Sequence, residues 1–579
     1  MASSGQRYVI VFNGEVYNFP DLRSQLEALG RSFSGRSDTE VMLAAMLEWG
    51  VEAAIQKFVG MFAFGLWDQA GRTLWLCRDR LGIKPLYYGW TPSGFLFASE
   101  LKAFCACPGF DRSLDRDGLS HYLSLGYIPQ PFTIYKGVQK LPPGCLLRLE
   151  CGAADQRARP QAYWDVAEAF ARGVAQPFAG TDAEAADQFD ALLRDAVRLR
   201  MLADVPLGAF LSGGIDSSTV VALMQAQSSQ PVKTFTIGFR EDRFDEASQA
   251  RDVARHLGTD HTELYLTAAD ALEIIPRLPV LYDEPFADSS QIPAFLVSRL
   301  ARQSVTVSLS GDGGDELLGG YTRYLSVPHA WAWLSKAPHP LRQVAAKVLL
   351  RPAVWLAGAL RLTGRSRSDA PGRSVADQLQ RLPGLVAANG LERFYNAVMT
   401  QWPAPPVIGA EAAELPTVPA KGLPHATARL MLMDFQRYLP DDILVKLDRA
   451  SMAVSLEARV PLLDHRLVEF AATLPLPLKI RNGHGKRLLR QVLYRYLPQP
   501  MVDRPKKGFN VPVAAWLRGP LREWAEALLQ PERLKRESWL SPEPIRRLWR
   551  DHLAFRRNGE HELWAVLMFQ AWLEKQKSG

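Results

Sequence analysis

The segment that decides the fold reads Leu211-Ser212-Gly213-Gly214-Ile215-Asp216-Ser217-Ser218, and it joins a predicted strand (208–211) to a predicted helix (217–227). Two adjacent glycines let the backbone turn tightly and point its N–H groups inward, and the following helix presents its positive end there. The serine hydroxyls add donors, and Asp216 can hold the Mg²⁺ that accompanies a triphosphate. A glycine-rich turn without chemical consequence is the alternative, but the whole string in this setting predicts a pyrophosphate-binding loop.

Strand and helix patterns alternate on both sides of this loop. Alternation at this pitch predicts βαβ units and therefore a doubly wound parallel sheet. A strict Walker-type phosphate loop is excluded, because Gly483-His484-Gly485-Lys486 lacks the leading glycine and Arg487 follows it. The predicted helices are 184–202, 246–257 and 291–302, and the predicted strands are 232–239, 261–266 and 305–309.

The chain divides into three zones. Residues 1–165 have the pattern of a β-rich domain with short helices, and residues 166–183, rich in Ala, Gly and Gln, are predicted to be a linker. The parallel sheet belongs to the third zone, residues 184–579, which becomes mainly helical from about Glu316 onward. A chain of 579 residues is too long for one hydrophobic core, which agrees with more than one domain.

Composition excludes several classes of protein. The net charge of +7 is a small difference between 68 basic and 61 acidic residues, without the basic clusters that a nucleic-acid partner requires. Five cysteines do not make a disulfide framework. The longest apolar stretch, 344–362, is interrupted by Lys347, Arg351, Pro352 and Arg361, so no membrane span is predicted. These features are typical of a cytoplasmic enzyme.

The glycine-rich loop and several other strings in the sequence resemble those of a known enzyme family. The loop resembles that of N-type ATP pyrophosphatases, which cleave ATP between the α and β phosphates. Together with the strings below it resembles the synthetase domain of glutamine-dependent asparagine synthetases, over nearly the whole chain. These strings are Ser310-Gly-Asp-Gly-Gly-Asp-Glu316, Gly319-Gly-Tyr321, Leu444-Val-Lys-Leu-Asp-Arg449, Met452-Ala-Val-Ser-Leu-Glu-Ala-Arg459, Pro461-Leu-Leu-Asp464 and Gly485-Lys486.

The resemblance implies ATP and Mg²⁺ as cofactors and assigns roles by position. Asp216 and Asp315 are expected near Mg²⁺–pyrophosphate, with Lys486 as their cationic partner and Lys446 as a second candidate cation. Asp312 occupies the position of an acidic residue, often Glu, that is important for acyl-adenylate formation. The nucleotide contacts implied beyond the loop are Leu211, Ile237, Ser310 and Gly311.

Two groups of polar residues leave alternatives open. A buried ion-pair network is as good an interpretation of Lys446, Asp448, Arg449 and Arg459 as a role in the reaction. A loop before the helix 291–302 is a weaker candidate for the wall of the acceptor pocket. It contains Asp283, Glu284 and Asp288-Ser289-Ser290.

The N-terminal zone resembles the glutaminase half of the same enzymes, an N-terminal-nucleophile amidotransferase of β-sandwich type. The resemblance implies that Asn13 and Gly14 stabilise the oxyanion and that Glu15 and Asp38 bind glutamine. It rests on Asn13-Gly-Glu-Val-Tyr-Asn18, Ser37-Asp-Thr-Glu40 and Arg78-Asp-Arg-Leu-Gly-Ile-Lys84-Pro-Leu-Tyr-Tyr88.

The nucleophile of that glutaminase is not found in this sequence. Residue 2 is Ala2, and none of the five cysteines is near the terminus. We expect the natural start to lie upstream, with Met1 an internal methionine and the domain incomplete. An ammonia-dependent variant is the alternative. The chain as written is expected not to hydrolyse glutamine.

The expected reaction is the ATP-dependent conversion of aspartate to asparagine through β-aspartyl-AMP, with nitrogen from glutamine or ammonia. One alternative is the same chemistry on another carboxylate, such as a surface-polysaccharide sugar. A second is a non-catalytic nucleotide-binding remnant. The expected partners are small molecules, without nucleic acid or membrane, and a homodimer is left open.

Overall fold

The computed structural model describes residues 1–151, 159–239, 247–349, 382–410, 415, 422–503 and 511–578. Its described strands form three sheets, in the orders β1-β2-β3-β7-β8, β5-β4-β6 and β11-β10-β9-β12-β13. The first two sheets belong to the N-terminal zone and are antiparallel, and the third is parallel.

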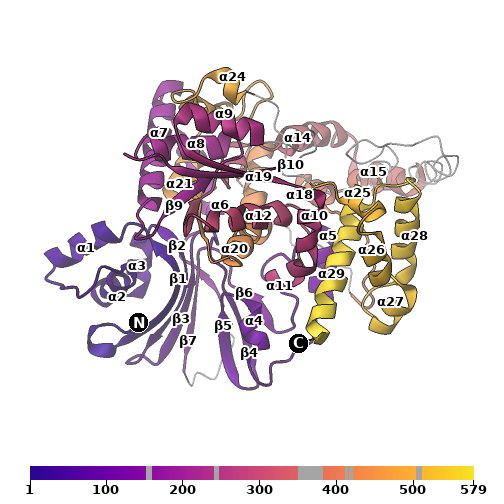
Figure 1. Ribbon diagram of the computed structural model, residues 1–579, viewed down its shortest axis with the longest axis horizontal. Helices are drawn as coiled ribbons and strands as arrows, with labels where there is room; N and C mark the ends of the chain where they lie inside the picture. Colours follow the sequence, from indigo (N-terminus) through magenta and orange to yellow (C-terminus); the bar gives the residue numbers. More distant parts are fainter. Residues whose placement is uncertain are drawn as a thin grey trace.

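The N-terminal zone is built on these antiparallel sheets, which lie in the lower part of Figure 1. β1 and β2 pair over their whole length, from Tyr8 opposite Asp68 to Val16 opposite Gly60. The bounds are β1 Tyr8–Val16, α1 Phe19–Ala28, α2 Asp38–Trp49, α3 Val51–Lys57, β2 Gly60–Asp68, β3 Thr73–Arg78, β4 Tyr87–Thr91, β5 Gly94–Ala98, α4 Leu101–Cys105, α5 Arg116–Leu125, β6 Val138–Lys140, β7 Cys145–Glu150 and β8 Gln161–Ala162.

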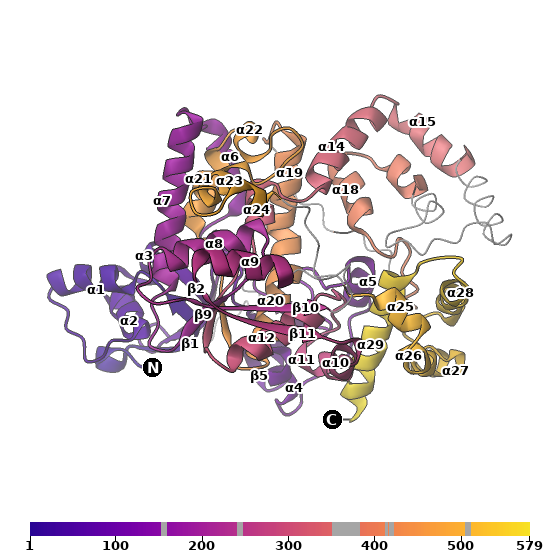
Figure 2. The same ribbon diagram turned by 45° about the horizontal axis from the view of Figure 1, so that its top comes forward.

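The predicted doubly wound parallel sheet is confirmed. Helices α8 and α9 cover one face, and α10 and α12 cover the other (Figure 2). The bounds are α7 Asp182–Arg200, β9 Leu207–Phe210, α8 Ile215–Gln225, β10 Lys233–Phe239, α9 Ala247–Leu257, β11 Asp260–Leu266, α10 Ala268–Ile274, α11 Leu278–Leu281, α12 Gln291–Arg302, β12 Val307–Leu309 and α13 Gly314–Leu318.

The described residues after α13 are mainly helical, as predicted, and one strand occurs among them. β13 (Glu457–Arg459) adds to the sheet beside β12, with Val307 opposite Glu457. The helices are α14 Arg323–Leu334, α15 His339–Val344, α18 Leu391–Met399, α19 Ala426–Met433, the π-helix η4 Asp434–Ile443, α20 Leu444–Met452, α21 His465–Thr473, α22 Leu476–Lys479, α23 Arg487–Leu493, α24 Gln499–Val502, α25 Val513–Arg518, α26 Arg522–Leu528, α27 Pro531–Glu537, α28 Pro542–Leu553 and α29 Glu560–Ser578.

The predicted linker contains a packed helix. α6 (Val166–Ala175) begins at Asp165, whose side chain accepts a hydrogen bond from the N–H of Ala167, and it packs against α21. Its Ala and Gly residues, which read as linker composition, allow close packing, since Gly173 lies against the backbone of Ala472. The segment 166–183 predicted to be a linker therefore includes a packed helix.

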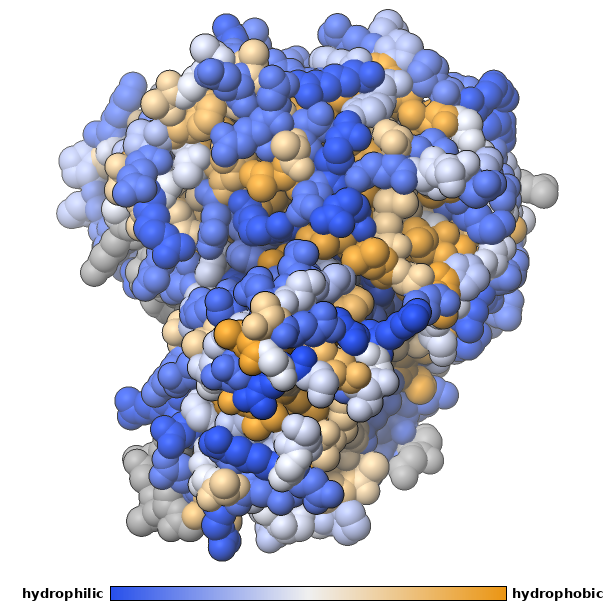
Figure 3. Space-filling model, turned by 90° about the vertical axis from the view of Figure 1, so that its left-hand side faces the viewer, coloured by the Kyte–Doolittle hydropathy of each residue, from blue (hydrophilic) through white to orange (hydrophobic). Residues whose placement is uncertain are grey.

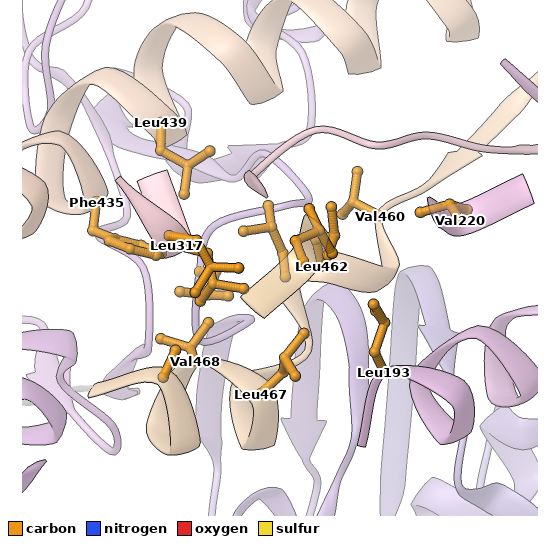
Figure 4. Packing of buried hydrophobic residues seen from close by; sticks show 14 of the residues in the cluster. Leu193, Val220, Leu317, Phe435, Leu439, Val460, Leu462, Leu467 and Val468 are labelled. Atoms are coloured by element: carbon orange, nitrogen blue, oxygen red, sulfur yellow. The ribbon is translucent and has the colours of Figure 1, made fainter. Parts of the chain in front are cut away.

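One hydrophobic core joins the parallel sheet to the later helices. It brings together Leu193 of α7, Val220 of α8, Leu317 of α13, Phe435 of η4 and Leu467 of α21 (Figure 4). Burial of these side chains fixes elements that lie far apart in the sequence around the end of the sheet where the candidate site forms.

The surface is mixed in character. The face seen in Figure 3 is mainly hydrophilic, with apolar residues in patches between polar ones. Among the described residues, no helix combines the length and the apolarity that a membrane crossing requires. Residues 350–362 of the apolar stretch considered above lie outside the described residues.

Candidate active site

The glycine-rich loop connects β9 to α8, as the sequence predicts. Gly213 has φ of 74°, a left-handed conformation that favours glycine. The hydroxyls of Ser212 and Ser217 lie 2.9 Å apart, and Ser217 Oγ accepts a hydrogen bond from the N–H of Ser212. The loop is therefore held by its own serines, and the N-terminus of α8 opens beside it.

A second loop, after β12, closes on the first. A Cβ on Gly311 would lie 2.6 Å from the backbone N of Ser217, so only glycine permits this approach. The N–H of Ser310 donates to the carbonyl of Arg459 in β13 (2.8 Å), which fixes the second loop to the sheet. The loops after β9 and β12 thus form one rim at the carboxyl ends of adjacent parallel strands, where open α/β sheets bind ligands.

Lys486 ties this rim together. Its Nζ lies 2.5 Å from Asp216 Oδ2 and 2.7 Å from Asp315 Oδ1. Its backbone has φ of 59° and its N–H donates to the carbonyl of Leu318, which sets the start of α23 against α13. Burial lowers the pKa of Lys486, but the two carboxylates outweigh burial and raise it above its ordinary value. Lys486 is therefore a fixed cation.

The two aspartates fit a magnesium site of the kind that also uses phosphate ligands. Mg²⁺ is usually bound by one or two carboxylates together with substrate phosphates and water. Asp216 and Asp315 share one cation, Lys486, and both line the same cavity. Among the described residues, no group of three or more His, Cys, Asp or Glu side chains forms a metal cluster, so an all-protein cage is not what this donor set provides.

These residues line a cavity of about 350 Å³. Apolar side chains from β9, β10, α12 and α20 contribute to its lining, and apolar lining suits the flat face of a base. The sequence-predicted residues that line it are Leu211, Ser212, Gly214, Asp216, Ser217, Ser310, Gly311, Asp312, Asp315, Lys446 and Lys486, with Ser290 from the weaker acceptor loop.

A second cation lies elsewhere on the cavity wall. Lys446 Nζ lies 2.7 Å from Asp288 Oδ2, and Asp288 also accepts from the N–H and hydroxyl of Ser290 at 2.9 and 2.7 Å. Burial lowers the pKa of Lys446, but Asp288 and then Asp442 raise it above the ordinary value. Asp312 also contributes to this rise and accepts a 2.6 Å hydrogen bond from Ser310 Oγ. Lys446 is thus charged at the cavity.

Several predicted residues lie away from the cavity wall. Ile237 is buried in the cluster that contains Phe295 and Leu296, and the β10 residue on the wall is Phe235, two positions earlier on the same face. Gly213 lies in the loop before α8, and Ser218 lies on the buried side of α8; neither lines the cavity. Ser289 is also absent from the wall.

Asp283 and Glu284 form ion pairs rather than the acceptor wall. Asp283 Oδ2 lies 2.9 Å from Arg449 Nη2, and Glu284 Oε1 lies 2.6 Å from Lys140 Nζ. Asp448 pairs with Lys84 at 3.3 Å. The ion-pair interpretation therefore describes Asp448, Arg449 and Arg459, whereas Lys446 belongs to the cavity.

The predicted glutamine-binding residues lie together in the N-terminal zone. Asn13, Gly14 and Glu15 are consecutive in β1, and Asp38 Oδ2 accepts a 3.0 Å hydrogen bond from the N–H of Val16. Asn13 donates to the hydroxyl of Ser99 (2.9 Å). Burial raises the pKa of Glu15 to about 7, against the opposing effect of Arg459.

Three polar residues in or beside the quoted strings line the cavity but carried no predicted role: Glu316, Tyr321 and Arg490; Gln249 of α9, outside those strings, is a fourth. Glu316 accepts a 2.7 Å hydrogen bond from Tyr321 Oη, and burial followed by the charge of Asp315 raises its pKa to about 7. All three occur in or beside the quoted strings, so a closer reading of each string's polar residues could have included them.

Comparison with known proteins gives matches over most of the chain. A family model described as asparagine synthase matches residues 188–574, and one described as a glutamine amidotransferase domain matches residues 1–164. A putative glutamine-hydrolysing asparagine synthetase of Mycobacterium tuberculosis is 36% identical over 98% of this chain and 84% of its own length. Asparagine synthetase 1 (glutamine-hydrolysing) of Bacillus subtilis is 31% identical over 98% and 85%. Amidase chry2 of Gibberella zeae is 27% identical over 89% and 78%.

Proposed function

Because the chain belongs to the asparagine synthase family, an enzyme family of ATP-dependent amide ligases, we propose that it converts aspartate to asparagine. ATP is the activating substrate, AMP and pyrophosphate are the products, and ammonia is the nitrogen that reacts. A cytoplasmic location and a homodimer remain predictions alongside this proposal.

One observation carries the proposal: Lys486 joins Asp216 and Asp315 at the rim of a cavity that two glycine-containing loops enclose. A protein that only binds a nucleotide does not need a buried lysine and two carboxylates around the phosphate position. An enzyme that expels pyrophosphate does, because charge accumulates on the leaving group in the transition state. Bound Mg²⁺, held by Asp216 and Asp315, would offset part of that charge.

The first step forms an acyl-adenylate. An oxygen of the aspartate side-chain carboxylate attacks the α-phosphorus, and the bond from that phosphorus to the bridging oxygen breaks, so that the electron pair leaves with pyrophosphate. The N–H groups and hydroxyls of the loop, with Lys486, would bind the departing phosphates. The site would thus favour the expelled anion over bound ATP.

The second step transfers the acyl group to ammonia. The nitrogen lone pair attacks the acyl carbon, the carbon–oxygen bond to AMP breaks, and the nitrogen releases a proton to solvent. Lys446, charged and fixed by Asp288, would hold the acceptor's negative charge during both steps. Asp312, held by Ser310, lines the same cavity and would orient the reacting groups.

A different acceptor acid is the second candidate. Two relatives similar to this chain are named amidases rather than synthetases of asparagine. The mixed charges around Lys446 (Asp288, Asp312 and Asp442) accommodate an acceptor that carries both an acidic and a basic group. Aspartate meets that description, and so does an amino-acid-like acid of other length.

The test is pyrophosphate release from ATP. The protein is incubated with aspartate and either ammonium or glutamine, and asparagine and AMP are quantified together with pyrophosphate. Release with aspartate, lost in Asp216→Ala, supports the proposal. Release with another carboxylic acid from a panel, but not with aspartate, would show that this acid and not aspartate is the substrate. Nucleotide binding without release by any acid would favour the non-catalytic alternative and refute the proposal.

A further inference from the structure

We propose that Arg490 is a second cationic contact for the leaving pyrophosphate, acting beside Lys486. The inference rests on the proposed function, because it assigns a residue to the same phosphate-binding end of the cavity. Arg490 lines that cavity together with Lys486, Gln249 and Val502.

The position of Arg490 follows from helix geometry. It lies four residues after Lys486, and its N–H donates to the carbonyl of Lys486 (2.9 Å) in the first turn of α23. Lys486 directly precedes α23 with φ of 59°, and both side chains reach the cavity from this end of the helix. Gln249 of α9 also lines the cavity and donates to the carbonyl of Gly213 in the glycine-rich loop (3.0 Å). Arg490 is therefore at the phosphate end rather than the adenine end.

The guanidinium is held in place by a second layer of side chains. Nη1 pairs with Asp503 Oδ1, and Nε donates to the carbonyl of Gly485 (3.3 Å). Asp503 is itself fixed by Tyr494 Oη at 2.9 and 2.8 Å and by Gln499 Nε2 at 2.9 Å. The side chain of Arg490 is 22% exposed and lines the cavity. A fixed planar guanidinium at a cavity wall is suited to a phosphate oxygen.

The charges at the rim show why Lys486 is not sufficient. Lys486 is one positive charge placed between two negative ones, Asp216 and Asp315. A bound divalent cation would make the net charge of this trio positive, but that charge would be smaller than the negative charge of pyrophosphate. Arg490 places a further guanidinium outside this trio, and because Asp503 pairs with it, we expect it to act through directed N–H donors rather than through net charge. Its partner Asp503 stays ionised, since hydrogen bonds from Gln499 and Tyr494 outweigh burial and lower the pKa of Asp503.

The same helix supplies a matched control. Arg487 lies at the start of α23, one residue after Lys486, but its guanidinium pairs with Asp182 and donates to the carbonyl of Pro477 (3.0 Å). It does not line the cavity. Arg487 and Arg490 are therefore both arginines of α23, and each pairs with an aspartate of its own. Only the side chain of Arg490 reaches the cavity.

The experiment measures binding of inorganic pyrophosphate with Mg²⁺ to the full chain by isothermal titration calorimetry. We expect Arg490→Ala to weaken this binding by about ten- to a hundredfold, the effect of losing a hydrogen bond to a charged group. Arg490→Lys should recover part of the loss, because it keeps the charge but not the fork of donors. Arg487→Ala should bind like the unmodified chain.

Two further measurements distinguish the loss of a pyrophosphate contact from damage to the whole site or to the fold. AMP binding to Arg490→Ala should be unchanged, and circular dichroism with thermal melting checks that each variant is folded. Equal pyrophosphate affinity in Arg490→Ala and Arg487→Ala, or an equal loss of AMP and pyrophosphate binding in Arg490→Ala, would overturn the inference. Because the titration needs no acceptor acid, it can succeed even where aspartate-dependent pyrophosphate release fails, so the two proposals are refuted by different results.

Discussion

The carboxylate of Glu15 lies 3.3 Å from the guanidinium of Arg459, and this ion pair joins the predicted glutamine-binding strand to the nucleotide end of the parallel sheet. Arg459 also donates to the carbonyls of Arg200 and Leu202, at 3.0 and 2.7 Å. Its own carbonyl accepts from the N–H of Ser310 at the cavity. One residue thus contacts both halves of the chain.

The first prediction concerns the pH dependence of stability through Glu15. Its pKa is raised from 4.5 to about 7, chiefly by burial. The folded state therefore holds a proton that the unfolded state releases, and the resulting stabilisation is complete below about pH 4.5 and is lost as pH rises through 7. At pH 8, Glu15→Gln should therefore have a higher melting temperature than the unmodified chain. Its free energy of unfolding should be larger by about 1–2 kcal/mol, after allowance for solvent screening.

The measurement is thermal melting of both proteins from pH 5 to pH 8. The advantage of Glu15→Gln should grow with pH across this range. Glu27→Gln, which alters an exposed carboxylate bonded to Arg23, is the control and should show no such trend. A constant difference between Glu15→Gln and the unmodified chain at all pH values would contradict the prediction.

The second prediction tests the Lys486 site with a substitution that adds bulk beside it and changes no charge. A Cβ on Gly320 would lie 2.1 Å from both Asp315 Oδ1 and Lys486 Cε, so Gly320→Ala must displace the pair. We expect pyrophosphate release to fall by about a hundredfold, as for the loss of one aligned electrostatic contact. Gly384→Ala, where a Cβ meets nothing within 4 Å, is the control and should retain activity. Normal release by folded Gly320→Ala would refute this account.

The third prediction separates the stability and activity roles of Lys446. Lys446→Met leaves Asp288, whose side chain is 22% exposed, without its cation and should destabilise the protein by about 1–3 kcal/mol. The double variant Lys446→Met/Asp288→Asn should regain much of that loss, because neither charge then remains unpaired. It should nevertheless stay defective in acyl-adenylate formation while it binds ATP. Melting temperature, ATP titration and pyrophosphate release are measured on all three proteins, and recovery of release in the double variant would exclude a role in the reaction.

The fourth prediction concerns the contact between the two halves. Lys84 and Asp448 form an ion pair at 3.3 Å with side chains only 4% and 9% exposed. Lys84→Met should destabilise the chain by about 2 kcal/mol, because the buried Asp448 then keeps only Arg449 as a cationic partner. The exposed pair of Arg547 and Glu543 is the control, since Arg547→Met should cost less than about 1 kcal/mol. Thermal melting distinguishes them, and equal effects would show that burial does not set the cost.

The local sequence was sufficient for several features. The two glycines and three serines predicted the loop after β9, because turn geometry and donor groups are properties of neighbouring residues. Alternating apolar patterns predicted β9 to β12 and the helices α8, α9 and α12 for the same reason, but not the short helices α10 and α11. Composition misled at α6, where small residues serve close packing rather than chain flexibility.

Contacts between distant residues were decided by the tertiary structure. The sequence alone marked Asp216 and Lys486 as candidates, but only the packing of α23 beside α8 and α13 brings their side chains to 2.5 Å. The short strand β13 was hidden in a helical zone, because its three residues form a strand only through pairing with β12. Residue type and local periodicity thus determined which chemistry the chain can carry. Burial of its shared core determined which of those groups meet, because packing depends on the whole chain at once.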